Sequence, residues 1–441
     1  MRGADQKKSK SLRFSFFDGI FASAMAGFTQ DYFAPFLLVI GATARHIGIL
    51  NALPNLFASL VQLLSADFTE KTGSRRTIIN VFVFCQALIL APMAITAFLG
   101  WPSVAFFIAL VILFTSLGAF FGPAWASLMC DLVDKDKRGE YFGWRNKALG
   151  FILVGATLIA GFILNQMKAV NIFYGFAVIF GCAFIFRIIS WYFLTRMYEP
   201  KLVHRKEDRF TLLNFLARIR ESNFAKFVLF VSMLNFSVNL ASPFFAVLML
   251  KNLHFSYLLY TSITITATLT IYLTISRWGR HADKVGNLKV IRFTAPLIAI
   301  LPLLWVINRD PVFLFFVQIV SGFAWAGFNL CASNFIYDAV TPEKRTRCIA
   351  YFNVLNGLAL AVGALLGGFL VEKMPPVLGY NILSLFIISS VLRLIVALFG
   401  PMKLKEVRPV ENISSDKLFF SMIGMKPLLG VDRKTIRYGE D

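Results

Sequence analysis

An aspartate lies inside a long apolar stretch near the start of the chain. Asp31 follows Gln30 within the apolar run 14–40 and lies four residues before Pro35, which removes a helix hydrogen bond and predicts a kink at this place. An ionisable residue in the hydrocarbon core costs about 2.5 kcal/mol or more. Loss of water favours the neutral form of a carboxyl and a nearby cation favours the charged form, so Asp31 could load and release a proton. The alternatives are that Asp31 only hydrogen-bonds a helix neighbour or contacts a solute without titrating.

Amides and tryptophans inside other apolar runs are candidates for the same site. Trp325 and Asn329 are four residues apart and therefore share a helix face, as do Asn51 and Asn55. An aromatic ring beside amides favours a ring-bearing, sugar-like or amphipathic ligand, although aromatic residues are common in a chain with 48 Phe. The candidates for proton coupling and solute binding are Asp31, Gln30, Asn235, Asn239, Trp125, Trp325, Asn329 and Asn55.

The elements that must position these residues are membrane spans. The 441 residues are 57% hydrophobic and only 15% charged, whereas soluble chains carry about 25% charged residues. Apolar runs of roughly 20 residues recur, which is the length that crosses a bilayer as a helix with every backbone group paired. We predict an all-α fold with twelve spans, at about 14–40, 46–66, 77–98, 102–129, 141–166, 170–194, 224–249, 256–276, 289–307, 311–336, 347–371 and 377–400.

The net charge of +20 reports topology and not nucleic-acid binding. Of the 44 Lys and Arg residues, 37 fall on the side that holds both termini, five on the other side, and two, Arg187 and Arg393, inside spans. This asymmetry predicts cytoplasmic termini and contact with anionic lipid in a plasma membrane, the inner membrane if the source is bacterial. We expect the two intramembrane arginines to be structural, either reaching the interface or pairing with a loop acid such as Asp131 or Asp338.

The chain contains an internal repeat. At an offset of 207 residues, Asp131 aligns with Asp338, and at 208 residues Pro35 aligns with Pro243 and Asp31 with Asn239. The predicted parts are a cytoplasmic N-terminus (1–13), a six-helix bundle (14–198), an amphipathic cytoplasmic linker (199–223), a second six-helix bundle (224–402) and a cytoplasmic tail (403–441). A parallel repeat of six-span halves is typical of secondary transporters that bind substrate between the halves.

The repeat also pairs Asp18 with Lys226 at the ends of the first and seventh spans. We expect both ends to be solvated, with an ion pair between the halves as the alternative.

Two loops carry a family signature. GRHADKVGNLK after the eighth span fits the pattern G-x-x-A-D-x-x-G-x-x-K/R, and ADFTEKTGSRR after the second span fits it with Ala66 in place of the first glycine. On these loops and the repeat, the chain resembles the major facilitator superfamily over about residues 14–400. The resemblance implies two six-helix bundles that rock about a central cavity lined mainly by the first, fourth, seventh and tenth helices.

The resemblance also implies a cytoplasmic gate in which loop acids and arginines stabilise one state. The residues that match are Glu70, Gly73, Arg75, Arg76, Asp283, Gly286, Arg138 and Arg345. The alternative is that these charges only set the topology. GALLGG in the eleventh span resembles an antiporter motif but lies in the wrong helix, and small residues there also permit close helix packing, so the direction of transport stays open.

These features predict a secondary transporter of a small organic solute, driven by protons and working as a monomer. A non-transporting sensor of the same fold is the alternative. No HExxH, GxSxG or Walker motif suggests an enzyme, and the five cysteines and four histidines show no metal-ligand spacing, so we predict no metal and no cofactor.

Overall fold

The protein is almost entirely helical in the computed structural model. The structure describes residues 2–100, 103–134, 138–200, 222–340, 342–407 and 418, although the side chains of 2–5, 66–67, 70, 138–140, 337 and 342–347 lie outside the described residues. Most of the linker predicted at 199–223 and most of the tail predicted at 403–441 therefore lie outside the described residues as well.

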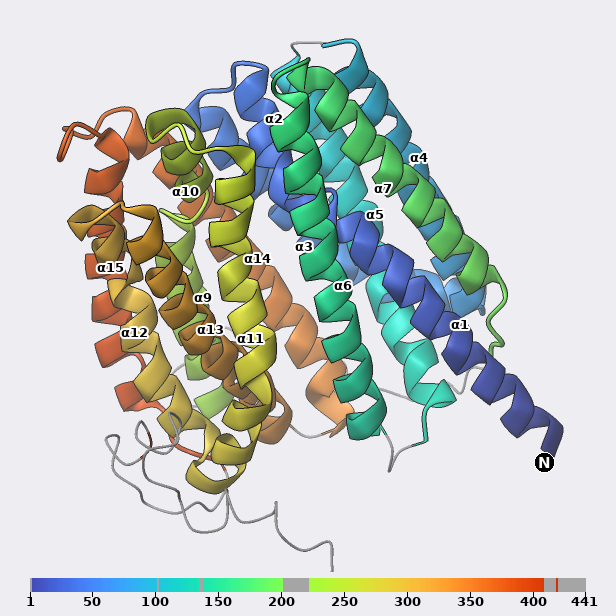
Figure 1. Cartoon of the computed structure of the whole chain (residues 1–441). Helices are drawn as coiled ribbons and strands as arrows, with labels where there is room; N and C mark the ends of the chain where they lie inside the picture. The colour runs from blue at the N-terminus through green and yellow to red at the C-terminus, as the bar shows by residue number, and fades with distance from the viewer. Residues whose placement is uncertain are drawn as a thin grey trace, which may run out of the picture. The chain divides into compact units, whose positions relative to one another are not determined.

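The predicted spans are present as helices (Figure 1). Eleven helices in the described part are long and apolar enough to cross a membrane, and the first predicted span is a helix interrupted into α1, η1 and α2. The elements are α1 (Arg2–Gly27), η1 (Gln30–Tyr32), α2 (Phe33–Val39), α3 (Ala44–Thr72), α4 (Arg75–Phe98), α5 (Val104–Leu132), α6 (Arg138–Met167), α7 (Ile172–Thr195), α9 (Asn223–Asn239), α10 (Phe244–Val247), the π-helical turn η3 (Leu248–Asn252), α11 (Tyr257–Val285), α12 (Asn287–Ile307), α13 (Pro311–Ala339), α14 (Pro342–Val371), α15 (Asn381–Phe399) and η4 (Pro401–Lys403).

The described contacts divide the chain into two compact units. Unit 1 comprises residues 1–206, 239–265 and 356–385, and unit 2 comprises 207–238, 266–355 and 386–441. Unit 1 therefore contains the first sequence half together with α10, η3 and one end each of α11, α14 and α15. Within unit 1, α1 packs against α6 and α7, and α4 packs against α5 and α7 (Figure 1). We call the end of unit 1 formed by the turns after α2, α4 and α6 the distal end.

The first span breaks before the proline that was expected to kink it. α1 ends at Gly27, where a Cβ atom would lie 2.8 Å from the carbonyl oxygen of Leu153, so only glycine allows this approach to α6. Residues 28–29 form a turn before η1. Pro35 is the third residue of α2. The first four N–H groups of a helix have no acceptor within the helix, so the missing N–H of proline breaks no helical hydrogen bond there. The interruption therefore lies around Asp31, where the proline was expected to kink the segment, and the close approach of Gly27 to α6 marks its start.

The seventh span is interrupted at the equivalent place. α9 ends at Asn239, and α10 begins at Phe244 directly after Pro243. Leu240 lies in this interruption, and a Cβ atom on Gly367 would lie 2.1 Å from its carbonyl oxygen. Both halves of the repeat thus place a non-helical turn about two thirds of the way along their first span, and each turn is packed against a glycine.

Small residues bring α3 and α14 into close contact within unit 1. A Cβ atom on Gly48 would lie 2.7 Å from the carbonyl oxygen of Ala364 and 3.1 Å from the Cα of Gly368. Ala52, Ala361 and Ala364 form a buried cluster beside this contact. The packing role that the small residues of GALLGG permit is therefore realised at the distal end.

We expect Gly48→Leu to open this contact, because the new side chain would overlap main-chain atoms that cannot rotate away. Overpacking of this kind costs about 1–3 kcal/mol, which corresponds to a rise in the open population of about fivefold to 150-fold. The measurement is maleimide labelling of a thiol introduced by Ala52→Cys after the five native cysteines are replaced by Ser. Gly181→Leu is the control, since a Cβ atom on Gly181 meets nothing within 4 Å. Equal labelling rates in the two leucine variants would contradict the prediction.

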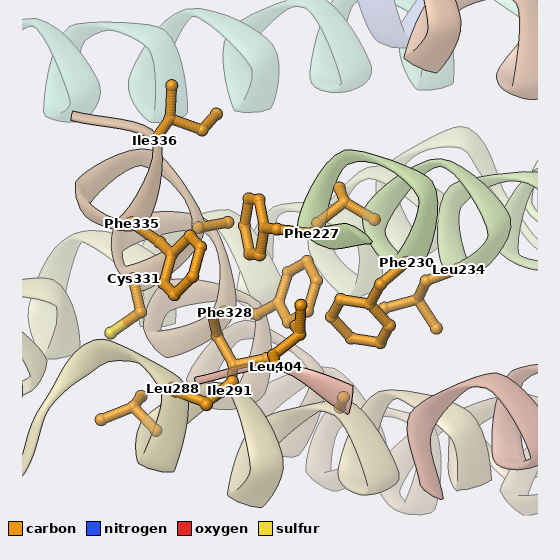
Figure 2. Close-up of a cluster of buried hydrophobic side chains, with 14 of the residues drawn as sticks. Phe227, Phe230, Leu234, Leu288, Ile291, Phe328, Cys331, Phe335, Ile336 and Leu404 are labelled. Atoms are coloured by element: carbon orange, nitrogen blue, oxygen red, sulfur yellow. The ribbon is translucent and has the colours of Figure 1, made fainter. Parts of the chain in front are cut away.

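The core of unit 2 is built from aromatic side chains of α9 and α13 (Figure 2). The rings of Phe227 and Phe335 stack with centroids 4.3 Å apart, and Phe230 meets Phe328 edge to face. Leu288 and Ile291 of α12 complete the cluster. Aromatic pairs of this kind fix the relative position of α9, α12 and α13.

Candidate functional site

Asp31 lies in the short 3-10 turn η1, where the first span is interrupted. Its side chain is exposed, as is that of Gln30, and among the described residues no side chain forms a hydrogen bond or ion pair with its carboxylate. Its backbone is held in place, because the hydroxyl of Tyr260 in α11 donates to the Asp31 carbonyl oxygen at 3.0 Å. The carboxylate is therefore accessible while its main chain is positioned by the second sequence half.

Tyr32, the next residue, joins the same turn to two helices. It is fully buried, and its hydroxyl donates to the carbonyl oxygen of Thr157 in α6 at 2.5 Å. The same hydroxyl lies 3.0 Å from the Oγ1 of Thr261 in α11. Gly161 provides the space, since a Cβ atom there would lie 2.4 Å from Thr261 Oγ1. Tyr32 thus links α6 of the first half to α11 of the second half, one residue from the exposed carboxylate.

Tyr32, Tyr260 and Thr261 were missed by the sequence analysis. Tyrosine and threonine are uncharged, so they carried no signal of the kind that an aspartate in an apolar run gives. The run of hydroxyl side chains in LYTSITITATLT of α11 was the available signal, because six Ser and Thr residues within twelve are unusual for a lipid-facing helix.

The structure places the predicted amides in different settings. Asn55 donates to the carbonyl oxygen of Asn51 at 2.7 Å, and Asn51 donates to that of Ile47 at 3.0 Å, so both amide groups bond within α3. Asn235 and Asn239 are half-buried on α9, in unit 2 and unit 1 respectively.

The two predicted tryptophans are each in contact with another side chain. The guanidinium of Arg145 lies over the ring of Trp125, 4.9 Å from its centroid, in unit 1. In unit 2, Trp325 is half-buried and meets Phe328 edge to face, whereas Asn329 is exposed. A role for these residues in binding a solute stays a prediction.

A second group of charged residues is buried between α1, α6 and α7. We call Asp18, Arg145, Arg187, Gln86 and Ser190 the buried charge cluster. Ser190 donates to the Asp18 carboxylate at 2.7 Å, and an Nη atom of Arg145 lies 4.0 Å from the same carboxylate. Arg187 donates to Gln86 at 2.8 Å and to Ser190 at 3.1 Å. Two arginines thus lie beside one buried aspartate, and Ser190 connects Arg187 to it by hydrogen bonds.

The buried charge cluster corrects two expectations. Asp18 is 4% exposed, so the expectation that it lies at a solvated helix end is wrong. Arg187 bonds to Gln86 and Ser190 within its own bundle, and Asp131 pairs with another arginine, so the loop acid named as its partner is wrong. In unit 2, Arg393 donates to the carbonyl oxygens of Ile298 and Val238 and to Ser389.

The first signature loop forms a turn and an ion-pair network. Gly73 has a φ of +67° and Gly286, its counterpart in the second loop, a φ of +89°, a backbone conformation that favours glycine. Arg75 is buried and donates to Asp131 at 2.6 Å and to the Pro200 carbonyl oxygen at 2.9 Å. Glu199 accepts the backbone N–H of Arg75 at 2.7 Å, which places a carboxylate at the N-terminus of α4. These partners all lie in unit 1.

The second loop repeats this geometry in unit 2. Glu406, which lies 207 residues after Glu199, accepts the backbone N–H of Leu288 at 2.7 Å. Asn287 donates to Asp338 at 2.9 Å, in the role that Arg75 has toward Asp131. The sequence analysis missed Glu199 and Glu406 as functional residues, although the repeat offset, carried past the sixth and twelfth spans, would have paired them.

The other gate candidates are less defined. Arg76 is exposed and donates to the carbonyl oxygen of Thr195, and Asp283 is exposed on α11. The side chains of Glu70, Arg138 and Arg345 lie outside the described residues, on α3, α6 and α14. Within the described part of the chain, no group of three or more His, Cys, Asp or Glu side chains could hold a metal ion.

Replacing Arg75 by Lys is expected to lower stability although the charge is kept. A lysine cannot reach Asp131, Ser127 and the Pro200 carbonyl oxygen at once, so we expect a loss of about 1–3 kcal/mol. The measurement is the free energy of unfolding in detergent. Arg76→Lys is the matched control and should change it by less than about 0.5 kcal/mol, since this neighbouring side chain is exposed. Equal losses in the free energy of unfolding of the two variants would contradict the prediction that the buried network stabilises the fold.

Comparison with known proteins agrees with this geometry. The model of the family described as Major Facilitator Superfamily matches residues 17–237 and again 227–429. A protein of Agrobacterium vitis, provisionally named as a tartrate transporter, is 26% identical over 182 residues, which cover 34% of this chain and 39% of that protein. The chain thus matches about two fifths of that relative's length.

Solved structures of transporters share the fold. A variant of the nucleoside transporter NupG matches with a TM-score of 0.72 and 13% identity, covering 90% of this chain and 100% of that one. A bacterial homologue of the human lysosomal transporter Spinster, inward-facing and unoccupied, matches at 0.64 and 13% over 90% and 96%. The human organic anion transporter MFSD10 matches at 0.61 and 16% over 89% and 99%. With apolar helices throughout and a family model matching both halves, this chain is an integral membrane protein that belongs to the major facilitator superfamily.

Proposed function

We propose that this protein is a secondary transporter that moves a small organic solute by alternating access, with Asp31 as the site of proton coupling. The observation that carries the proposal is the exposed Asp31 carboxylate in the short 3-10 turn that interrupts the first span. A charged group at that depth is costly, and intramembrane acids of transporters commonly serve as proton relays.

The contacts around Asp31 provide a route from protonation to movement. Tyr260 holds the Asp31 carbonyl oxygen, and Tyr32 joins α6 to α11. A change in the charge of Asp31 therefore acts on a turn that is bonded to helices of both sequence halves. Movement of α11 away from α6 would break these bonds and alter the access of the carboxylate to water.

The close contact between α3 and α14 supports one closed state. It lies at the distal end of unit 1, next to the interrupted first span. Alternating access requires that this end opens in another state, and a contact made by small side chains separates without leaving buried charges unpaired.

The termini are proposed to be cytoplasmic, and the membrane to be the plasma membrane, because 37 of 44 Lys and Arg residues fall on the side of the termini. The protein is proposed to act as a monomer and not as an enzyme.

Uptake into proteoliposomes with an imposed pH gradient tests the proposal. The solutes to screen are sugars, nucleosides and organic acids such as tartrate, with lipophilic cations as a further class. Accumulation of one class that collapses when a protonophore removes the gradient is the expected result. Absence of gradient-driven flux for all classes would favour a non-transporting sensor of the same fold.

A further inference from the structure

A groove opens at the end of unit 1 opposite the distal end. Its walls come from the first turns of α1, the end of α5 and the start of α6, and its volume is about 930 Å³. The α1 wall consists of the pairs Lys8 and Ser9, Leu12 and Arg13, and Phe16 and Phe17, which recur every four residues and therefore share one helix face. The candidate transport residues are not among its lining side chains.

The groove changes from charged to aromatic along the helix axis. Lys8 and Phe17 are separated by about 13 Å at 1.5 Å per residue, with Arg13 between them. The apolar part is completed by Trp144 of α6, whose ring lies 4.6 Å from that of Phe16. Trp144 is 55% exposed and Phe17 45% exposed, so two large aromatic side chains remain uncovered.

This gradient follows the direction in which α1 enters the membrane. α1 begins at Arg2 and reaches its apolar part at about residue 14, so the charged end of the groove lies at the water boundary and the aromatic end inside it. Tyr141 and Trp144 line the same wall, and Tyr and Trp are enriched at such boundaries. A ligand that fits has a charged head at Lys8 and an apolar body toward Phe17.

The charge of the groove selects an anion. Lys8 and Arg13 face one acid, Asp134, across the charged part. Lys7 and Lys10 are exposed on the same helix and add to the positive field, although neither lines the groove. Basic residues at this position attract the anionic lipids of the adjacent leaflet.

We propose that this groove binds one anionic phospholipid from the leaflet that faces the N-terminus. The phosphate lies between Lys8 and Arg13, and the acyl chains run along Phe16, Phe17 and Trp144. The volume is at the upper end of the range for ligand pockets, which accommodates a headgroup, the glycerol and the first part of the chains.

Native mass spectrometry of the full chain in a neutral detergent tests this assignment. The chain is titrated with phosphatidylglycerol and, separately, phosphatidylcholine. We expect one tightly retained phosphatidylglycerol and at least about fivefold weaker binding in the double variant Lys8→Gln/Arg13→Gln. The matched control is Lys7→Gln/Lys10→Gln, which removes the same charge from the same helix outside the groove and should retain the lipid. Trp144→Ala should weaken binding as well, because it shortens the apolar wall.

Three outcomes would overturn the proposal. Equal weakening in both double variants would mean that net charge alone attracts lipid. Equal retention of phosphatidylcholine would mean that the basic pair does not select the head. Displacement of the lipid by glycerol phosphate at equal concentration would assign the groove to a small free anion. The unfolding midpoint of each variant without lipid separates these outcomes from a folding defect. If the double variant unfolds, lipid binding by Trp144→Ala, which keeps both basic residues, still tests the proposal.

Discussion

Asp31→Asn is expected to abolish solute accumulation driven by a pH gradient while exchange of solute across the membrane continues. Asparagine resembles the neutral form of the carboxyl in shape but cannot release a proton, so a variant that still changes conformation can no longer couple this change to proton movement. The measurement is a pair of assays on the same proteoliposomes, one with an imposed pH gradient and one with solute on both sides and no gradient. Gradient-driven uptake should fall at least about a hundredfold, and the exchange rate should lose its dependence on pH.

Glu372→Gln is the matched control for this variant. Glu372 is an exposed acid beyond the end of α14, so its replacement makes the same chemical change outside the proposed site. Its uptake should equal that of the unaltered protein. If Asp31→Asn retains full gradient-driven uptake, Asp31 is not the coupling site, whereas loss of both exchange and uptake would assign Asp31 to solute binding.

Arg187→Met is expected to cause the largest loss of stability. Arg187 is 3% exposed, and it bonds to Gln86 and to Ser190, which holds the Asp18 carboxylate. Removing Arg187 takes away its hydrogen bonds to Gln86 and Ser190 and leaves Arg145, 4.0 Å away, as the one cation beside the Asp18 carboxylate, so we expect a loss of about 3–5 kcal/mol. The measurement is the free energy of unfolding in detergent. The double variant Asp18→Asn/Arg187→Met should recover part of this loss, because it removes the carboxylate whose pairing the single variant weakens.

Arg393→Met provides a comparison at the related position of the second half. Arg393 is equally buried, but its described partners are two carbonyl oxygens and a hydroxyl. Arg393→Met removes the donor of neutral acceptors and changes no pairing of a carboxylate. We therefore expect a smaller loss in the free energy of unfolding, of about 1–3 kcal/mol. A loss as large as that of Arg187→Met, with no recovery in the Asp18 double variant, would contradict the explanation by buried charge.

The spans and the repeat could be predicted because they depend on properties that are local in the chain. Hydrophobic length predicts a helix wherever the solvent is lipid, and α4 to α7 begin and end close to the expected residues. The signature loops were recognised for a similar reason, since Gly73 and Gly286 must adopt a positive φ at a turn whose length is set by the chain itself.

The partners of the polar residues could not be predicted in the same way. From its depth alone, Arg187 was expected to reach the interface or to pair with a loop acid. Its surroundings instead contain Asp18 of α1 and Gln86 of α4, more than 100 residues away in sequence. The kink in the first span could be expected near Asp31, because Pro35, four residues later, is a local signal. The close contact of Gly27 with α6 at the end of α1 could not be expected, because it depends on a neighbour that is not visible in a single segment.

The sequence by itself determined that this is a helical membrane protein of two related halves with a carboxyl inside its first span, because hydrophobic length, repetition and an isolated charge can be recognised along one chain. Only the tertiary structure decided that Tyr32 and Tyr260 hold the turn of Asp31 to α6 and α11, and that Asp18 lies between two arginines. The physical reason is that a buried polar group must be paired, and which partner pairs with it depends on how the helices pack.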